Sequence, residues 1–141
     1  MVAEEAGSPI KTLQVVKEVL IAAPADVVFQ TILQPHGPTK DMNMKLEPWP
    51  GGRWFRDLGN NTGHLWGHVQ VIKPPVLLEL SGPMFMSYPA LNHVEIKLDQ
   101  IAGGTKVTLR HRSIGLLEEA HRQNIGGGWK HYLDNIRKDV S

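Results

Sequence analysis

The clearest alternation of apolar and polar residues lies in the second half of the chain. Within Leu91–Gln100, the apolar residues Val94, Ile96 and Leu98 alternate with polar ones, and Thr105–Arg112 alternates in the same way. The string Ala102-Gly103-Gly104 separates the two segments. A period of two residues on each side of a glycine turn predicts an antiparallel hairpin with one face in water.

Five further segments favour strands, because β-branched and other apolar residues recur in them and Pro, Gly and Asn separate them. These segments are Leu13–Ile21, Met44–Trp49, Arg53–Leu58, Leu65–Lys73 and Val76–Leu80. Together with the hairpin they indicate a largely antiparallel sheet.

Two segments favour helices. In Leu116–Val140 the apolar residues recur at helical spacing, with acidic residues near the start and basic residues near the end. Pro24–Leu33 is predicted to be a short helix, which Pro35, Gly37 and Pro38 end. Pro24 suits its first position because proline has no N–H to leave unpaired. The order of elements predicts an α+β domain in which a curved antiparallel sheet is covered by the last helix.

Length and composition narrow the class of protein. A chain of 141 residues with a formal net charge of +1 corresponds to one domain, and neither a nucleic-acid binder nor a polybasic membrane adaptor is expected. Residues 1–12 are expected to form a flexible tail and 13–141 the domain. No apolar run is long enough to cross a membrane, and the acidic start is unlike a secretory signal. A cytoplasmic location is therefore expected.

Four strings of residues, in this order, are shared with a known superfamily. They are Ile21–Phe29, Pro50–Trp54, Gly67–Pro75, and Gly127-Gly128-Trp129 leading into Tyr132-Leu133. With these strings the chain resembles the START-like (SRPBCC) helix-grip superfamily over roughly residues 13 to 139. Within it, the chain is similar to the family named after homologues of the activator of the heat-shock-chaperone ATPase.

The resemblance implies a helix-grip fold with a cavity between the sheet and the long C-terminal helix. It does not specify a function, because the superfamily includes lipid carriers, plant-ligand binders, polyketide cyclases and chaperone partners.

Tryptophan and methionine at candidate inner positions also favour a cavity, because these side chains suit irregular apolar pockets. An ordinary core is the other explanation, and for any single one of these residues it is the more common one. The candidate ligand-binding residues are Trp49, Trp54, Trp66, Met84, Met86, His111, Gly127 and Trp129.

The run Gly126-Gly127-Gly128 lies inside the predicted C-terminal helix. Three glycines there cost roughly 3 kcal/mol relative to alanine. Three explanations remain open: close approach of the helix to the sheet, a kink, and open volume for a ligand beside Trp129.

The candidate catalytic residues are few, and none is assigned a role. By alternation His111 faces inward, where it is either a hydrogen-bonded core residue or a general base that Glu79 assists. Arg53 is either an anchor for an anionic headgroup or a surface residue that stacks on Trp54.

No metal or other cofactor is predicted. The chain has no cysteine, which excludes disulfides and thiolate ligands. His64 and His68 are about 13 Å apart in a strand, at 3.3 Å per residue. His121 and His131 are about 15 Å apart along a helix. Neither pair can hold one ion.

Three functions compete. The favoured one is a binding protein that encloses a small apolar or amphipathic ligand, without catalysis. The second is an interaction module, a chaperone cofactor or stress-response partner, that docks through an exposed patch at Pro83–Pro89. The third is an enzyme of the cyclase or hydratase kind with His111 as its base.

Overall fold

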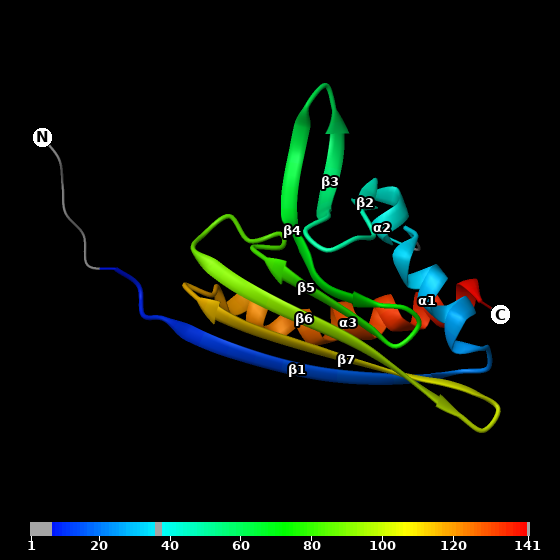
Figure 1. Ribbon diagram of the computed structural model, residues 1–141. Helices are drawn as coiled ribbons and strands as arrows, with labels where there is room; N and C mark the ends of the chain where they lie inside the picture. Colours follow the sequence, from blue (N-terminus) through cyan, green and yellow to red (C-terminus); the bar gives the residue numbers. More distant parts are fainter. Residues whose placement is uncertain (1–6, 36–37, 141) are drawn as a thin grey trace, which may run out of the picture.

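The computed structural model describes residues 7–35 and 38–140 (Figure 1). In chain order the elements are β1 (Lys11–Ile21), α1 (Ala25–Leu33), α2 (Pro38–Asp41), β2 (Met44–Leu46), β3 (Arg53–Gly59), β4 (Thr62–Lys73), β5 (Leu77–Gly82), β6 (Ala90–Ile101), β7 (Gly104–Gly115) and α3 (Glu119–Asp139). Of the predicted tail, residues 1–6 lie outside the described residues, and Lys11 and Thr12 belong to β1.

All strands of the described chain form one antiparallel sheet in the order β1-β7-β6-β5-β4-β3-β2. The predicted hairpin is confirmed as β6 and β7, which pair from Ala90↔Gly115 to Ile101↔Gly104. β1 pairs with β7 on the outer side. The first and last strands are therefore neighbours, and α3 follows directly from β7.

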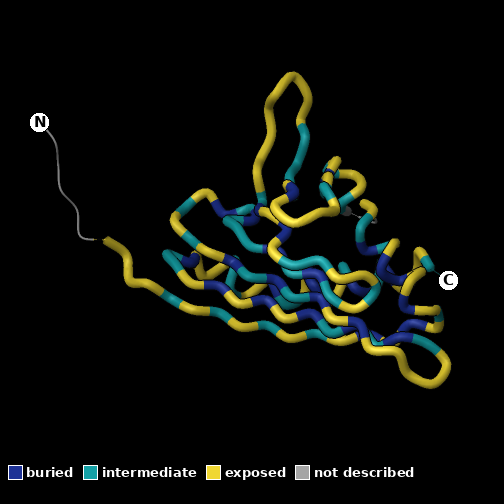
Figure 2. The backbone as a smooth tube through the Cα atoms, in the orientation of Figure 1, coloured by how far each residue is buried: buried dark blue, intermediate teal, exposed yellow. Residues whose placement is uncertain are grey.

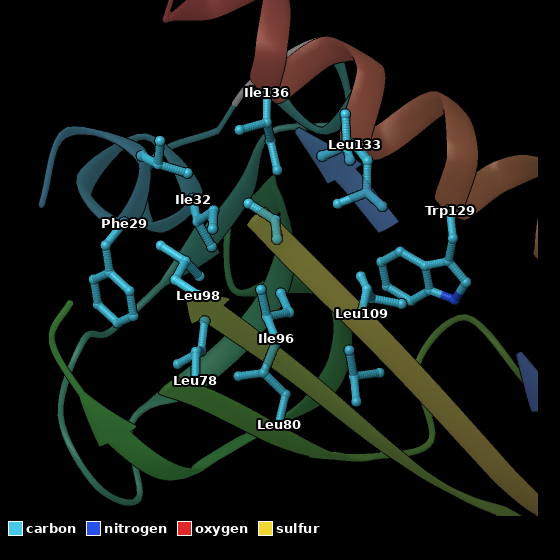
Figure 3. Close-up of a cluster of buried hydrophobic side chains, with 14 of the residues drawn as sticks. Phe29, Ile32, Leu78, Leu80, Ile96, Leu98, Leu109, Trp129, Leu133 and Ile136 are labelled. Atoms are coloured by element: carbon cyan, nitrogen blue, oxygen red, sulfur yellow. The ribbon is translucent and has the colours of Figure 1, made fainter. Parts of the chain in front are cut away.

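The α3 helix lies across one face of the sheet, and buried and exposed residues alternate along the strands beneath it (Figures 1 and 2). The predicted apolar stripe of α3 is confirmed, since Ile125, Trp129, Leu133 and Ile136 are its buried residues. They pack with residues of α1, β5, β6 and β7 in one core (Figure 3). The α+β fold predicted from the sequence is thus confirmed.

Several element bounds differ from the prediction. The strand predicted over Met44–Trp49 is shorter, because β2 ends at Leu46 and the chain then turns towards β3. Pro24 is the N-cap of α1 and not its first helical residue. The short helix α2 was not predicted, and Gly37, expected to help end α1, lies outside the described residues.

The β3–β4 hairpin extends away from the body of the molecule (Figure 1). Asn60 and Asn61 at its tip both have positive φ, as a tight hairpin turn requires. At its base, a Cβ on Gly67 or Gly82 would collide with the backbone of the other strand. Glycine at these positions allows β4 and the end of β5 to approach each other where the hairpin leaves the sheet.

Candidate functional site

A pocket of about 410 Å³ lies between α3 and the base of the β3–β4 hairpin. We call it the α3 pocket. Its apolar wall consists of Trp66 from β4, Met84 and Phe85 from the β5–β6 connection, and Ile125, Trp129 and Tyr132 from α3. Met42, Gly128 and a few polar residues complete the lining. The pocket is of the size and composition of small-molecule sites.

The close approach of β4 and β5 places Trp66 and Met84 side by side. The backbone N–H of Met84 donates a 2.8 Å hydrogen bond to the carbonyl of Trp66. Met84 has a φ of 55°, in the left-handed region that methionine rarely adopts. The bond to Trp66 and the burial of the side chain hold Met84 in this conformation.

Aromatic rings continue from the hairpin base to the start of α3. Trp66 packs edge to face against Phe85 at 5.7 Å, and Phe85 packs in the same way against His121 at 4.9 Å. On the other side of the pocket, Trp129 packs perpendicular to Tyr132 at 5.3 Å. Such contacts add stability beyond the area that they bury, so this wall of the pocket is well packed.

His121 is held by the connection that precedes α3. The backbone N–H of Glu118 can only donate, so the Tyr88 hydroxyl oxygen accepts from it at 3.2 Å. The Tyr88 hydroxyl keeps its hydrogen for donation, and Nδ1 of His121, 2.7 Å away, can accept it. With Nδ1 as the acceptor, the neutral His121 ring carries its hydrogen on Nε2.

His111 lies beneath the pocket in a buried polar network. Trp129 Nε1 donates to Nδ1 of His111 at 2.9 Å, and Nε2 of His111 lies 2.7 Å from Oδ1 of Asn92. Because an indole N–H can only donate, Nδ1 is the acceptor and Nε2 carries the hydrogen. Ser113 also donates to Asn92 Oδ1. Both ring nitrogens of His111 are therefore engaged.

Burial lowers the pKa of His111 from 6.5 to about 4, because the apolar surroundings disfavour the charged imidazolium. His111 is consequently neutral near pH 7. The same physical cause raises the pKa of Tyr132 above its ordinary value. His111 is thus the hydrogen-bonded core residue of the two alternatives, because its lone pair on Nδ1 already accepts from Trp129.

Five of the eight candidate site residues lie at the α3 pocket or directly beneath it. Trp66, Met84 and Trp129 line it. His111 contacts Trp129 from below. Met86 is buried, and its sulfur lies 3.5 Å from Nδ2 of Asn92.

The lining of the α3 pocket does not include Trp49, Trp54 or Gly127. Trp49 is 54% exposed in the turn between β2 and β3. Trp54 packs edge to face against Trp66 and lines a smaller cavity that shares Thr39, Trp129 and Tyr132 with the α3 pocket. The side chain of Trp49 is not directed inward, because β2 ends before this residue and the chain there follows the surface.

Gly127 and Gly128 are both exposed, and of the two only Gly128 lines the pocket. A Cβ would meet nothing within 4 Å at either position, and at Gly126 it would make only ordinary contact with Lys17. The α3 helix is also continuous through the run. Close packing and a break in the helix therefore do not explain the glycines. A kink stays a prediction, and open volume is present at Gly128 instead of Gly127.

Two further expectations are corrected. Glu79 cannot assist His111, because it lies on the outer face of the sheet with its Oε1 2.8 Å from Nε2 of His93. Arg53 does not stack on Trp54. Its guanidinium lies over the ring of Phe55 and pairs with Glu47, whose pKa this contact lowers to about 2.

The segment Pro83–Pro89 is not the exposed patch that an interaction module was expected to present. Met84 and Met86 are buried, and Phe85 and Tyr88 are half-buried against α3. The segment forms a wall of the α3 pocket because its apolar side chains turn inward.

Sequence reasoning missed His121, Asn124, Gly128 and Tyr132, which all line the pocket. They recur every three to four residues, so they share one face of α3 beside the buried stripe. That spacing was visible in the sequence. Thr39 and Met42, from the region of α2, carry no comparable signal.

Among residues 7–35 and 38–140, no three His, Asp or Glu side chains lie close enough together to hold a metal ion. Within the same residues, no helix is long and apolar enough to cross a membrane.

Comparison with known proteins identifies the family. The family model described as "Activator of Hsp90 ATPase homolog 1-like protein" matches residues 22–140. The comparison with curated protein sequences found no match.

Solved structures share the fold. An uncharacterised protein from Rhizobium leguminosarum superposes with a TM-score of 0.74 at 18% identity, over 94% of this chain and 96% of that one. CalU16 from Micromonospora echinospora gives 0.65 at 20% identity, over 96% and 84%.

An AHSA1-like protein from Rhizobium etli gives a TM-score of 0.62 at 27% identity, over 97% of this chain and 86% of that one. The resemblance expected from the sequence is confirmed, and the chain belongs to the Activator of Hsp90 ATPase homolog 1-like family of helix-grip proteins.

Proposed function

We propose that the protein binds a small, largely apolar molecule in the α3 pocket and performs no chemistry on it. One observation carries the proposal: an apolar space of about 410 Å³ stays open beside a well-packed core. Apolar walls normally collapse on each other to bury their surface. A space of this size is typical of sites that bury most of a small ligand.

Gly128 supports the proposal, because a glycine in a helix interior costs about 1 kcal/mol relative to alanine. The position tolerates a side chain sterically, since nothing lies within 4 Å of its missing Cβ. The glycine therefore leaves volume in the pocket that any other residue would fill.

The first test is native mass spectrometry of the purified chain against its denatured mass. A noncovalent adduct of small-molecule size is expected, and its mass gives the ligand class. In parallel, the uncharged fluorophore N-phenylnaphthylamine is titrated into the protein, and its emission reports transfer into an apolar site.

Two variants locate the binding. Gly128→Leu places a side chain in the α3 pocket and is expected to abolish fluorophore binding, whereas Gly127→Leu, one position along on the solvent face, is expected to keep it. Equal binding by both variants, or no binding by the folded wild type, would contradict the proposal.

The two alternative functions have less support. A chaperone-cofactor role rests on the family description, and Pro83–Pro89 contributes Met84 and Phe85 to the pocket instead of an exposed patch. A cyclase- or hydratase-like reaction needs a free base, and both nitrogens of His111 are engaged. The cytoplasmic location stays a prediction.

A further inference from the structure

Four polar residues that can donate a hydrogen bond line the α3 pocket. They are Thr39, His121, Asn124 and His131, and each of these side chains can also accept one. Among the described residues, no Asp or Glu lines the pocket. A ligand group that accepts hydrogen bonds is therefore matched by this lining, whereas a cationic group would find no counter-charge.

His121 is the donor whose orientation the structure determines. Tyr88 occupies its Nδ1, and Phe85 packs against the ring at 4.9 Å. Tyr88 is not part of the pocket lining, so the Nδ1 edge of the ring is turned to the connection before α3. The two ring nitrogens of an imidazole point to opposite sides, so Nε2 is directed away from Tyr88, and His121 lines the pocket.

The start of α3 adds a favourable field. His121 lies in the first turn of this 21-residue helix, where unpaired backbone N–H groups carry partial positive charge. The side chain of the N-cap residue Glu118 makes no capping hydrogen bond. Glu119 in the same turn is exposed and paired with Arg122. An anionic or strongly dipolar oxygen near His121 is therefore stabilised.

A second donor at the pocket also lacks an acceptor. The Nε1 atom of Trp66 is buried and has no hydrogen-bond partner among the described residues. Most buried donors in proteins are paired. A ligand oxygen that accepts from Trp66 Nε1 would pair this donor, just as it would pair the N–H of His121.

We infer that the α3 pocket takes a flat aromatic molecule with an acceptor oxygen group, which the Nε2–H of His121 binds. The inference rests on the proposed ligand-binding function and names the ligand chemistry. The aromatic body is matched by the rings of Trp66, Phe85, Trp129 and Tyr132, which present faces and edges to one space. His121 orients the oxygen at the N-terminal end of α3.

The test compares two fluorophores with the same aromatic body. Anilinonaphthalene sulfonate carries an acceptor anion, and N-phenylnaphthylamine carries none. Wild type is expected to bind the sulfonate about tenfold more tightly, which is the effect of one hydrogen bond to a charged group. Dissociation constants come from fluorescence titration.

Three variants place the oxygen. His121→Phe keeps a ring against Phe85 but removes the N–H, and is expected to erase the preference for the sulfonate over N-phenylnaphthylamine. Tyr88→Phe removes the hydroxyl that orients the ring and is expected to reduce the preference. His64→Phe is the control, because this exposed histidine of the β3–β4 hairpin lies outside the pocket lining, and it is expected to keep the preference.

The outcomes distinguish the role of His121 from the ligand-binding function. If both fluorophores bind wild type equally, or if His121→Phe keeps the preference, the inference about His121 is overturned and the ligand-binding function stands. If neither fluorophore binds the folded protein, the proposed function fails and the inference fails with it. Loss of binding is read only in variants whose circular dichroism and melting temperature match wild type.

Discussion

The indole N–H of Trp129 donates to Nδ1 of His111 at 2.9 Å, and this bond links the pocket wall to the buried polar network of the sheet. Trp129 comes from α3 and His111 from β7. The bond determines the tautomer of His111 and the orientation of the Trp129 ring. A substitution that breaks this bond is therefore expected to affect both the wall of the α3 pocket and the polar network around His111.

Replacing the two pocket tryptophans by phenylalanine is expected to have unequal effects. Trp129→Phe leaves Nδ1 of His111 buried without a donor, and we expect the free energy of unfolding to fall by about 2 to 4 kcal/mol. Trp66→Phe removes an N–H that has no partner, and we expect a loss of about 1 kcal/mol. Urea unfolding followed by circular dichroism measures both. A larger loss for Trp66→Phe would contradict the network described here.

The stability of the protein is expected to decrease on acidification through His111. The unfolded chain binds the proton with a pKa of 6.5 and the folded protein with a pKa of about 4. Between these values the unfolded state binds more protons, so the free energy of unfolding falls as pH falls and is unaffected by this group above pH 6.5. The loss from about pH 7 to about pH 4.5 is about 2 to 3 kcal/mol.

Urea unfolding at both pH values tests this expectation, with His111→Gln as the control. Glutamine offers a donor and an acceptor but does not titrate. The difference in unfolding free energy between wild type and the variant should therefore narrow as pH falls. A constant difference would show that His111 titrates alike in both states.

Asn92 is expected to matter more than Ser113 in the same network. Asn92→Ala removes the shared acceptor of the His111 Nε2–H and the Ser113 hydroxyl, and leaves Nε2 only a longer contact of 3.3 Å to Ser113 Oγ. We expect a cost of about 3 kcal/mol or more. Ser113→Ala leaves Asn92 Oδ1 still bonded to His111 and should cost about 1 kcal/mol. Thermal and urea unfolding of both variants measure the order, and equal costs would contradict it.

Gly127→Ala is expected to stabilise the protein by about 0.5 to 1 kcal/mol. The position is helical and exposed, and an added Cβ meets nothing within 4 Å. Ligand binding should not change, because Gly127 does not line the pocket. Thermal unfolding and fluorophore titration of the variant measure both effects. A destabilised variant would contradict this expectation, because it would mean that the backbone of α3 requires glycine at position 127.

Most of the fold could be predicted from the sequence, because it depends on local periodicity. The alternation in Leu91–Gln100 and Thr105–Arg112 is sufficient to predict a half-buried hairpin, and the apolar stripe of 116–140 is sufficient to predict which face of α3 is buried. The ends of the strands were less predictable. In the strand predicted over Met44–Trp49, the backbone turns after Leu46 although the residues beyond it are still compatible with a strand.

The candidate site was only partly predictable, because it joins residues far apart in the chain. The inward direction of His111 follows from alternation, but its donor Trp129 and its acceptor Asn92 follow from the register of β6 against β7 and the position of α3. Trp49 and Trp66 were both predicted to face inward. Only the end of β2 and the close approach of Gly67 to Gly82 place one on the surface and the other in the pocket.

Gly127 and Gly128 show where sequence reasoning ends. The sequence by itself determined the order of the elements, the buried stripe of α3 and the family, since these follow from periodicity and from strings of residues. Consecutive helical residues point about 100° apart, so the rotation of α3 on the sheet decides which glycine faces the pocket. Packing of Ile125, Trp129 and Ile136 against the strands sets that rotation, and it exists only in the tertiary structure.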